Sequence, residues 1–168
     1  MESFGKSSNV SDVAEGLTRF LTGKSVYLCI GTEKVAADSL GPKVGKKLND
    51  KMERPAYVYG TIGANVTAQN VTKTYEMVRN LHPDSTVVVI DAGVGEAEQV
   101  GEIQVDGKGI VPGAATGKNL APTGHVSVVG VVSERDLDKF YEESDEKNSV
   151  VERLAEKIVQ AIVLAQRV

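Results

Sequence analysis

Apolar residues along this chain follow two patterns, which alternate from one end to the other. Short runs of apolar or β-branched residues are typical of buried strands. Such runs, with one alternating stretch, predict five strands at residues 26–30, 56–61, 86–90, 100–105 and 125–132. Apolar residues spaced three and four apart are typical of helices with one buried side. They predict four main helices, near residues 10–21, 42–52, 71–81 and 149–165.

The order of these elements predicts the fold class. Strands that alternate with helices favour an α/β fold, a three-layer α/β/α sandwich around a mostly parallel, mixed sheet of about five strands. The segment 94–99 is too short for a crossover helix, so strand 100–105 should run antiparallel to its predecessor. We see no domain linker and no internal repeat, which predicts a single domain over residues 1–168, with residues 1–8 disordered.

Smaller segments carry signals for loops and helix ends. Residues 107–122 are rich in Gly, Ala and Pro and predict an irregular loop. Residues 134–147 are dense in charge and predict a short helix followed by an exposed turn. Ser149 and Glu152 have the spacing of a capping box, and Thr67 has the properties of a cap, so both sites predict helix starts.

The composition narrows the class of protein. The net charge of −4 argues against a nucleic-acid surface, which would need a basic patch. No apolar stretch approaches the roughly 18 residues of a membrane span, and the first residues lack a signal-peptide pattern. Cys29, the single cysteine, lies in an apolar run, which indicates a buried, inert thiol in a reducing compartment. We therefore expect a cytoplasmic protein without nucleic-acid or membrane partners.

The stretch from Cys29 to Pro42 carries the most informative chemistry. A strand ends in Gly31, a loop with two acids follows, and Gly41 and Pro42 open a helix. Open α/β sheets place ligands and catalysis at such positions, outside the carboxyl ends of the strands. Asp38 lies just before the helix start, where the positive end of the helix favours an ionised carboxylate. It therefore either caps the helix or faces whatever binds there.

A second acid, Asp91, follows the most apolar strand. A carboxylate in that position is costly unless it is hydrogen-bonded, paired or used. If the two strands are neighbours, Asp38 and Asp91 reach one crevice, where one pKa rises and an acid–base pair results. The same acids would instead hold a divalent metal, nickel or zinc, if His125 joins them. Strand direction argues against His125, because this residue begins its strand, and only the preceding loop would carry it across.

Three other kinds of site fit the sequence less well. Residues 113–119 look like a phosphate-binding loop, but they have one residue too few between the glycines and Asn where Ser or Thr would bind magnesium. The segment 93–95 lacks the third glycine of a dinucleotide fingerprint. Ser39 and Ser127 have no evident partners for a catalytic triad, so a serine hydrolase is not predicted.

Three segments, in order and spacing, resemble a known family. They are Ala37 to Pro42, Val89 to Ala92 and Ile103 to Gly113. Together they resemble the YyaC-like sporulation proteins, and more distantly the germination protease of spore-forming bacteria and the hydrogenase maturation endopeptidases. The resemblance covers roughly Lys24 to Val132, does not extend to residues 134–147, and implies a phosphorylase/hydrolase-like fold.

The relatives imply two uses of the same acids. In the germination protease, the aspartates that match Asp38 and Asp91 are the proposed catalytic pair, and small acid-soluble spore proteins are the substrates. In the hydrogenase maturation enzymes, acids at equivalent places and a later His bind the nickel of the substrate, which would make His125 the third ligand. The YyaC-like proteins tend to have Asp rather than His at that third position.

The sequence thus predicts a peptidase of sporulation or germination that acts on a protein or peptide through Asp38 and Asp91. The expected substrate-binding positions are Gly31, Thr32, Gly93, Gly113 and Thr116. Most are glycines, which let a peptide backbone approach closely. No cofactor is required, and a divalent metal is an optional addition through His125. The alternative is a non-catalytic binding or regulatory domain of the same fold, which would bury or separate the two carboxylates.

Overall fold

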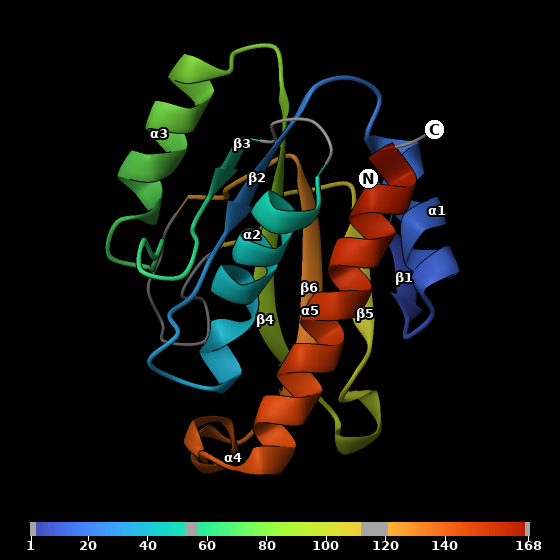
Figure 1. The fold of residues 1–168 in the computed structure, drawn as a ribbon, viewed down its shortest axis with the longest axis vertical. Coiled ribbons are helices and arrows are strands. Elements are labelled where there is room, and N and C mark those ends of the chain that lie inside the picture. The colour runs from blue at the N-terminus through green and yellow to red at the C-terminus, as the bar shows by residue number, and fades with distance from the viewer. Residues whose placement is uncertain (1–2, 53–56, 112–120, 167–168) are drawn as a thin grey trace.

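The computed structural model describes residues 3–52, 57–111 and 121–166, which fold around one sheet (Figure 1). Within these residues the sheet has six strands, in the order β1-β5-β6-β4-β2-β3. Their bounds are β1 Ser3–Ser7, β2 Ser25–Cys29, β3 Tyr57–Tyr59, β4 Thr86–Gly95, β5 Ile103–Asp106 and β6 Val126–Glu134. The predicted α/β class with a mostly parallel, mixed sheet is confirmed, with one strand more than expected.

The sheet is parallel in its centre and antiparallel at one edge. β3, β2, β4 and β6 run parallel to one another, whereas β5 runs antiparallel to β6, and β1 runs antiparallel to β5. The short connection after β4 contains only the 3-10 helix η2 (Ala97–Gln99), and it reverses the chain direction as predicted. β4 and β5 do not form a simple hairpin, because β6 lies between them in the sheet.

Helices cover the two faces of the sheet unequally. Three pack on one face: α1 (Val10–Phe20), α2 (Leu40–Lys51) and α5 (Asp145–Gln166). α3 (Val71–Leu81) packs on the other face (Figure 1). Val88 and Ile90 of β4 belong to the three-helix core. Val87 and Val89 alternate to the α3 side, which one helix of the described residues covers.

β4 is the central strand and is longer than predicted. Its side chains from Val87 to Ile90 have no exposed surface, as expected for a parallel strand covered on both faces. The strand continues to Gly95 because β6 pairs with it along that length, with a register shift between Gly93 and Val94. Asp91 therefore lies within β4 and not at its tip.

The first strand corrects the prediction of disorder at the N-terminus. Residues 1–8 are polar and small, yet Ser3–Ser7 forms β1 and pairs antiparallel with β5. A local pattern cannot reveal such a strand, because its hydrogen-bond partner lies about a hundred residues further along the chain. β5 supplies the open strand edge that makes the extended conformation favourable.

Two predicted helix starts are also wrong. α5 begins at Asp145, so the capping-box residue Ser149 lies inside the helix, and the Ser144 hydroxyl accepts the Lys147 N–H at 3.1 Å instead. α3 begins at Val71, and the carbonyl of Thr67 closes the turn before it. Each segment holds several residues able to cap, and the packing of the helix selects among them.

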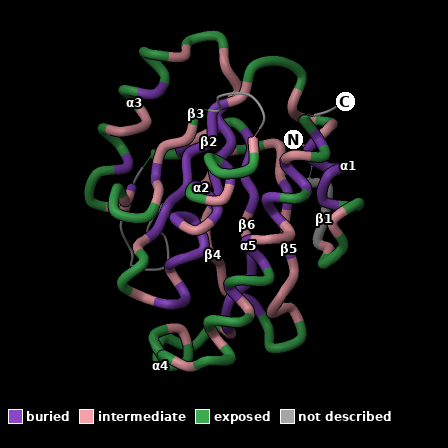
Figure 2. Tube along the Cα trace, in the orientation of Figure 1, coloured by how far each residue is buried: buried purple, intermediate pink, exposed green. Residues whose placement is uncertain are grey.

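The lysines of α2 form ion pairs with α5 across the surface. Lys47 contacts Glu152 at 2.6 Å and Glu156 at 2.8 Å, while Lys43 and Lys51 each contact one of the same two acids. Glu152, seven residues inside α5, thus faces the lysines of α2. Figure 2 shows buried residues concentrated in the sheet, with α4 (Leu137–Tyr141) mostly exposed. Among the described residues, no helix has the length and apolar character needed to cross a membrane.

Candidate active site

Asp38 lies in the loop that follows β2. Ile30 adds one parallel bridge after the strand, and Gly31 then turns the chain with a φ of +140°. The loop closes where the Thr32 N–H donates to the Asp38 carbonyl oxygen at 2.9 Å. The 3-10 helix η1 (Ala37–Ser39) carries Asp38 and leads directly into α2. The carboxylate is thus held between the end of a strand and the start of a helix.

Gly31 is the residue that permits this loop. Its φ falls in a region that side-chain-bearing residues rarely adopt. A Cβ at position 31 would lie 2.1 Å from the carbonyl oxygen of Asp38, so any side chain would displace the segment that carries the acid. The sequence predicts that a peptide backbone approaches Gly31 closely. In the structure, the main chain of the loop itself occupies that place.

Asp91 lies on β4 beside the start of that loop. The residue before it, Ile90, accepts the Ile30 N–H at 2.8 Å, which joins the two strand ends. Side-chain alternation along β4 places Asp91 on the α3 side of the sheet. One of its carboxylate oxygens accepts the N–H of the next residue, Ala92, at 2.8 Å. The structure therefore brings Asp91, in the middle of β4, beside the carboxyl end of β2 and the loop that carries Asp38.

Burial affects both carboxylates, and the charge of Asp38 also acts on Asp91. Burial raises the pKa of Asp38 to about 6, while a hydrogen bond from the Thr32 backbone acts in the opposite direction. Burial and then the negative charge of Asp38 raise the pKa of Asp91 well above its usual range. Both residues keep partial contact with solvent. The pKa of Asp91 is thus raised by two causes and that of Asp38 by one, so a proton held by the pair favours Asp91.

The other predicted substrate-binding positions are Thr32, Gly93, Gly113 and Thr116, and they do not share one environment. Thr32 belongs to the same loop as Asp38, and its hydroxyl accepts a main-chain N–H within the loop at 3.2 Å. Gly93 lies two residues beyond the second acid, where a Cβ would come within 2.5 Å of a Val129 methyl group. Gly113 and Thr116 lie outside the described residues.

His125 lies at the other end of the sheet, so the predicted metal triad is wrong. It precedes β6, and its Nδ1 accepts the Val87 N–H at 2.9 Å. Val87 stands four residues before Asp91 on β4, a separation of about 13 Å at the rise of a parallel strand. The cause is strand direction, because β6 runs parallel to β4 and its start lies beside the start of β4.

A nickel or zinc site does not fit the remaining donors. The described residues contain no group of three His, Cys, Asp or Glu side chains that could hold a metal ion. Asp38 and Asp91 offer oxygen ligands without the nitrogen that suits zinc or nickel. The two carboxylates are therefore interpreted as an acid pair.

Glu33, the other acid in the loop that carries Asp38, has a structural role. Glu33 accepts the Gly63 N–H at 3.1 Å and a hydrogen bond from the side-chain amide of Asn65. The same amide donates to the Thr61 carbonyl at 3.1 Å. Glu33 thus ties the Asp38 loop to the turn that follows β3, beside the acid pair.

Glu143 is a contact that the sequence did not reveal. Its carboxylate accepts the Ala36 N–H at 3.1 Å across 107 residues of sequence, at the start of the helix that carries Asp38. It lies in the turn between α4 and α5. The Lys147 ammonium group holds that turn by donating to the main-chain carbonyls of Lys139, Phe140 and Glu142. The segment predicted only as an exposed turn therefore supports the candidate site.

Comparison with known proteins gives the family. A family model described as "Protein of unknown function (DUF1256)" matches residues 4–161. The chain belongs to the DUF1256 family. The chain is 30% identical over 142 residues to the uncharacterized protein YyaC of Bacillus subtilis (strain 168), covering 84% of this chain and 69% of that protein. The resemblance to YyaC-like proteins is confirmed.

A solved structure supports the fold of this DUF1256 chain. The NiFe hydrogenase maturation protease HycI from Thermococcus kodakarensis KOD1 matches with a TM-score of 0.50 and 18% identity, over 87% of this chain and 97% of that one. The likeness is one of fold. The DUF1256 match also includes residues 134–147, which corrects the expectation that the family likeness ends before them.

Proposed function

We propose that this DUF1256 chain is a peptidase in which Asp38 and Asp91 form the catalytic pair. The observation that carries the proposal is that two partly buried acids lie on one strand and in the loop after its neighbour, where burial raises both pKa values and the charge of Asp38 further raises that of Asp91. An acid pair that served only structure would be expected to have cationic partners. Within the described residues, neither carboxylate forms an ion pair.

The different pKa values suggest a role for each acid. Asp38, with a pKa of about 6, is ionised at neutral pH and would take a proton from the attacking water. Asp91, with the higher pKa, would hold its proton and give it to the leaving amine. One proton enters the pair and one leaves it in each cleavage. The next cycle requires the proton to pass from Asp38 back to Asp91, which their proximity allows.

A protein or peptide is the proposed substrate. HycI is a maturation protease by name, and the resemblance of the motifs to the germination protease points in the same direction. Thr32 belongs to the loop that carries Asp38 and would contact the substrate backbone, and the predicted positions Gly93, Gly113 and Thr116 would join it. The resemblance also supports a role in spore formation or germination.

The test is a cleavage profile on a peptide library made from a bacterial proteome. Wild-type protein, Asp38→Asn and Asp91→Asn are incubated with the library, and new peptide ends are identified by mass spectrometry. We expect new ends with wild type alone, because Asn cannot exchange a proton at neutral pH.

Two outcomes would reject the peptidase. One is an equal set of new ends with all three proteins, which would mark a contaminant. The other is the absence of new ends with folded wild type across the library. Peptides retained by both wild type and Asp91→Asn without cleavage would favour the non-catalytic binding domain.

A further inference from the structure

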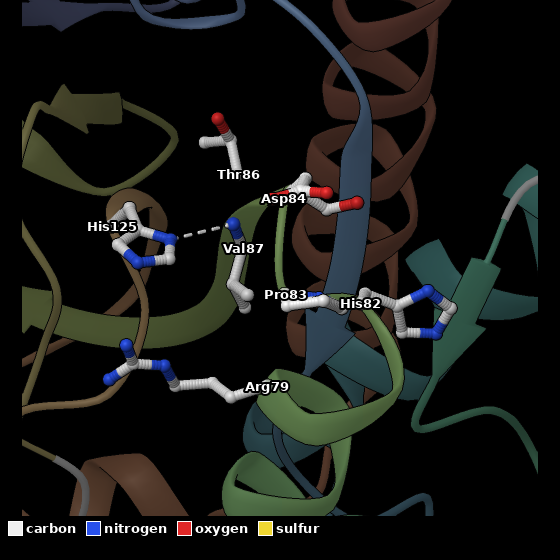
Figure 3. A pocket seen from close by; sticks show the side chains of 8 residues that line it. Arg79, His82, Pro83, Asp84, Thr86, Val87 and His125 are labelled. Atoms are coloured by element: carbon white, nitrogen blue, oxygen red, sulfur yellow. Dashed lines mark hydrogen bonds between the residues drawn. The ribbon is translucent and has the colours of Figure 1, made fainter.

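A cavity of about 240 Å³ opens at the amino ends of β4 and β6, away from the acid pair. Its walls are the end of α3, the turn from His82 to Ser85, the first residues of β4, and His125 (Figure 3). Neither the proposed cleavage nor the family comparison uses these residues. The cavity is therefore a separate candidate site.

The hydrogen bonds of His125 determine which ring nitrogen carries a proton. Its Nδ1 accepts the Val87 N–H at 2.9 Å, while its own main-chain N–H donates to the Val87 carbonyl at 2.8 Å. A neutral imidazole whose Nδ1 accepts must carry its proton on Nε2. Within the described residues, no acceptor binds that Nε2–H. Figure 3 shows the second ring nitrogen on the side of the Arg79 guanidinium.

Arg79 adds a positive charge to the same cavity. Its guanidinium lies 5.8 Å from the centre of the Tyr75 ring, a contact that orients the side chain and leaves its N–H donors available. Within the described part of the chain, Arg79 forms no ion pair with a carboxylate. Burial and then the Arg79 charge lower the pKa of His125, so the imidazole is neutral beside a permanent cation.

We propose that this cavity binds the carboxylate group of a small molecule between the Arg79 guanidinium and the His125 Nε2–H. A guanidinium presents parallel donors that match a carboxylate, and the imidazole adds one donor from a second direction. Asp84 lines the same cavity. Its negative charge offsets part of the Arg79 attraction, and a dianion costs more to desolvate than a monoanion, so a carboxylate is favoured over a phosphate dianion. The cavity volume is below the usual range for drug-sized ligands and suits a small metabolite.

The proposal is tested by NMR titration of the amide and arginine side-chain signals. Sodium acetate is the probe, with sodium phosphate and sodium chloride compared at equal ionic strength. Acetate should shift the signals of Val87, His125 and the Arg79 side chain saturably, and phosphate should bind more weakly at neutral pH. Chloride should cause no saturable shift.

Three variants sharpen the test. Arg79→Met keeps the apolar stem and should weaken acetate binding about tenfold, as expected for loss of a charge-assisted pair. His125→Asn keeps an acceptor for the Val87 N–H but removes the Nε2–H, and it should weaken binding about fivefold. Arg153→Met, on the surface of α5, is the matched control and should bind as wild type does.

Binding of acetate by folded Arg79→Met at wild-type strength would overturn the proposal. So would equal, unsaturated shifts with acetate and chloride. Tighter binding of phosphate than of acetate would reject the role assigned to Asp84 and with it the proposed class of ligand. None of these results depends on whether Asp38 and Asp91 cleave peptides, because the readout is binding at the other end of the sheet.

Discussion

The two ends of the parallel strands carry side chains of opposite charge, and at each end a neighbouring charge shifts a pKa. At the carboxyl end, Asp38 raises the pKa of Asp91. At the amino end, Arg79 lowers the pKa of His125. In both cases a neighbour of the same charge, added to burial, favours the neutral form of one partner. The acid pair, Asp38 and Asp91, and the basic pair, Arg79 and His125, therefore lie at opposite ends of the same strands, a few residues apart along β4.

The two ends differ in what holds them. The basic end depends mainly on neighbouring strands, since His125 is bonded to Val87 by both its main chain and its ring. The acid end depends on a long loop, on Gly31 and on Glu143 from the C-terminal part of the chain. Changes to the loop at the acid end should therefore affect stability as well as chemistry, whereas changes at the basic end should affect mainly binding.

The largest expected effect is on cleavage. On any peptide that the wild type cleaves, Asp91→Asn should lower the rate by about 10²–10⁴-fold, the range for loss of an acid–base group. Its melting temperature should change little, because Asn resembles the protonated Asp91 and can still accept the Ala92 N–H. Rates are measured by quantifying product peptides, with Asp50→Asn on the surface of α2 as the matched control. A rate for Asp91→Asn equal to that of the control would leave Asp91 without a catalytic role.

The next effect is on the pH dependence of stability. The folded-state pKa of Asp38, about 6, lies above its ordinary 3.8, so the folded protein binds this proton more tightly than the unfolded chain. Asp38 therefore destabilises the protein above pH 6, and the penalty disappears as the pH falls from 6 toward 4. A fully buried group would cost about 3 kcal/mol, which partial exposure reduces to about 1–2 kcal/mol.

Asp38→Asn should remove that penalty. The variant should be more stable than wild type by about 1–2 kcal/mol at neutral pH and equal to it near pH 4, where both carry a neutral side chain. Urea unfolding at the two pH values measures the difference, again with Asp50→Asn alongside. A difference that did not depend on pH would show that the charge of Asp38 is not the cause.

A smaller effect is expected at the contact between Glu143 and the Asp38 loop. Glu143→Ala leaves the Ala36 N–H without its partner and should cost about 1 kcal/mol of stability, with faster hydrogen exchange at Ala36. Glu143→Gln keeps an oxygen acceptor and should restore most of the protection. If the two variants exchange alike, the bond does not order the loop.

The smallest effect should be at the basic end. Arg79→Met should change the free energy of unfolding by no more than about 0.5 kcal/mol, as for most exposed substitutions. The same unfolding experiment used for Asp38→Asn measures it. A loss as large as that expected for Glu143→Ala would contradict the view that this end is built for binding.

The pattern of the chain predicts the parts that local sequence decides. Apolar runs identify β2, β4 and β6, because strands covered on both faces need continuous apolar residues. The meeting of Asp38 and Asp91 also follows from the sequence, since each comes after such a run and the carboxyl ends of parallel strands share one edge. Their catalytic role stays a prediction.

The missed strand and the missed contact with the Asp38 loop depend on partners far away in the sequence. Ser3–Ser7 is a strand only because β5 offers an edge, and Glu143 gains its role only when the turn after α4 meets Ala36. His125 shows the opposite case, since strand direction argued against the metal triad and the likeness to relatives argued for it. The physical rule was correct there, because strand direction determines which end of the sheet a residue occupies.

The bond from Glu143 to Ala36 has a consequence for the newly made chain. On the ribosome, β2 and the Asp38 loop emerge more than a hundred residues before Glu143, and β6, the strand beside β4, also emerges late. A nascent or truncated chain therefore lacks the Glu143 contact with the loop and the pairing of β4 with β6. If the acid pair cleaves proteins, a chain that is still on the ribosome has an incomplete active site. Activity then begins only when synthesis is nearly complete, which protects neighbouring polypeptides.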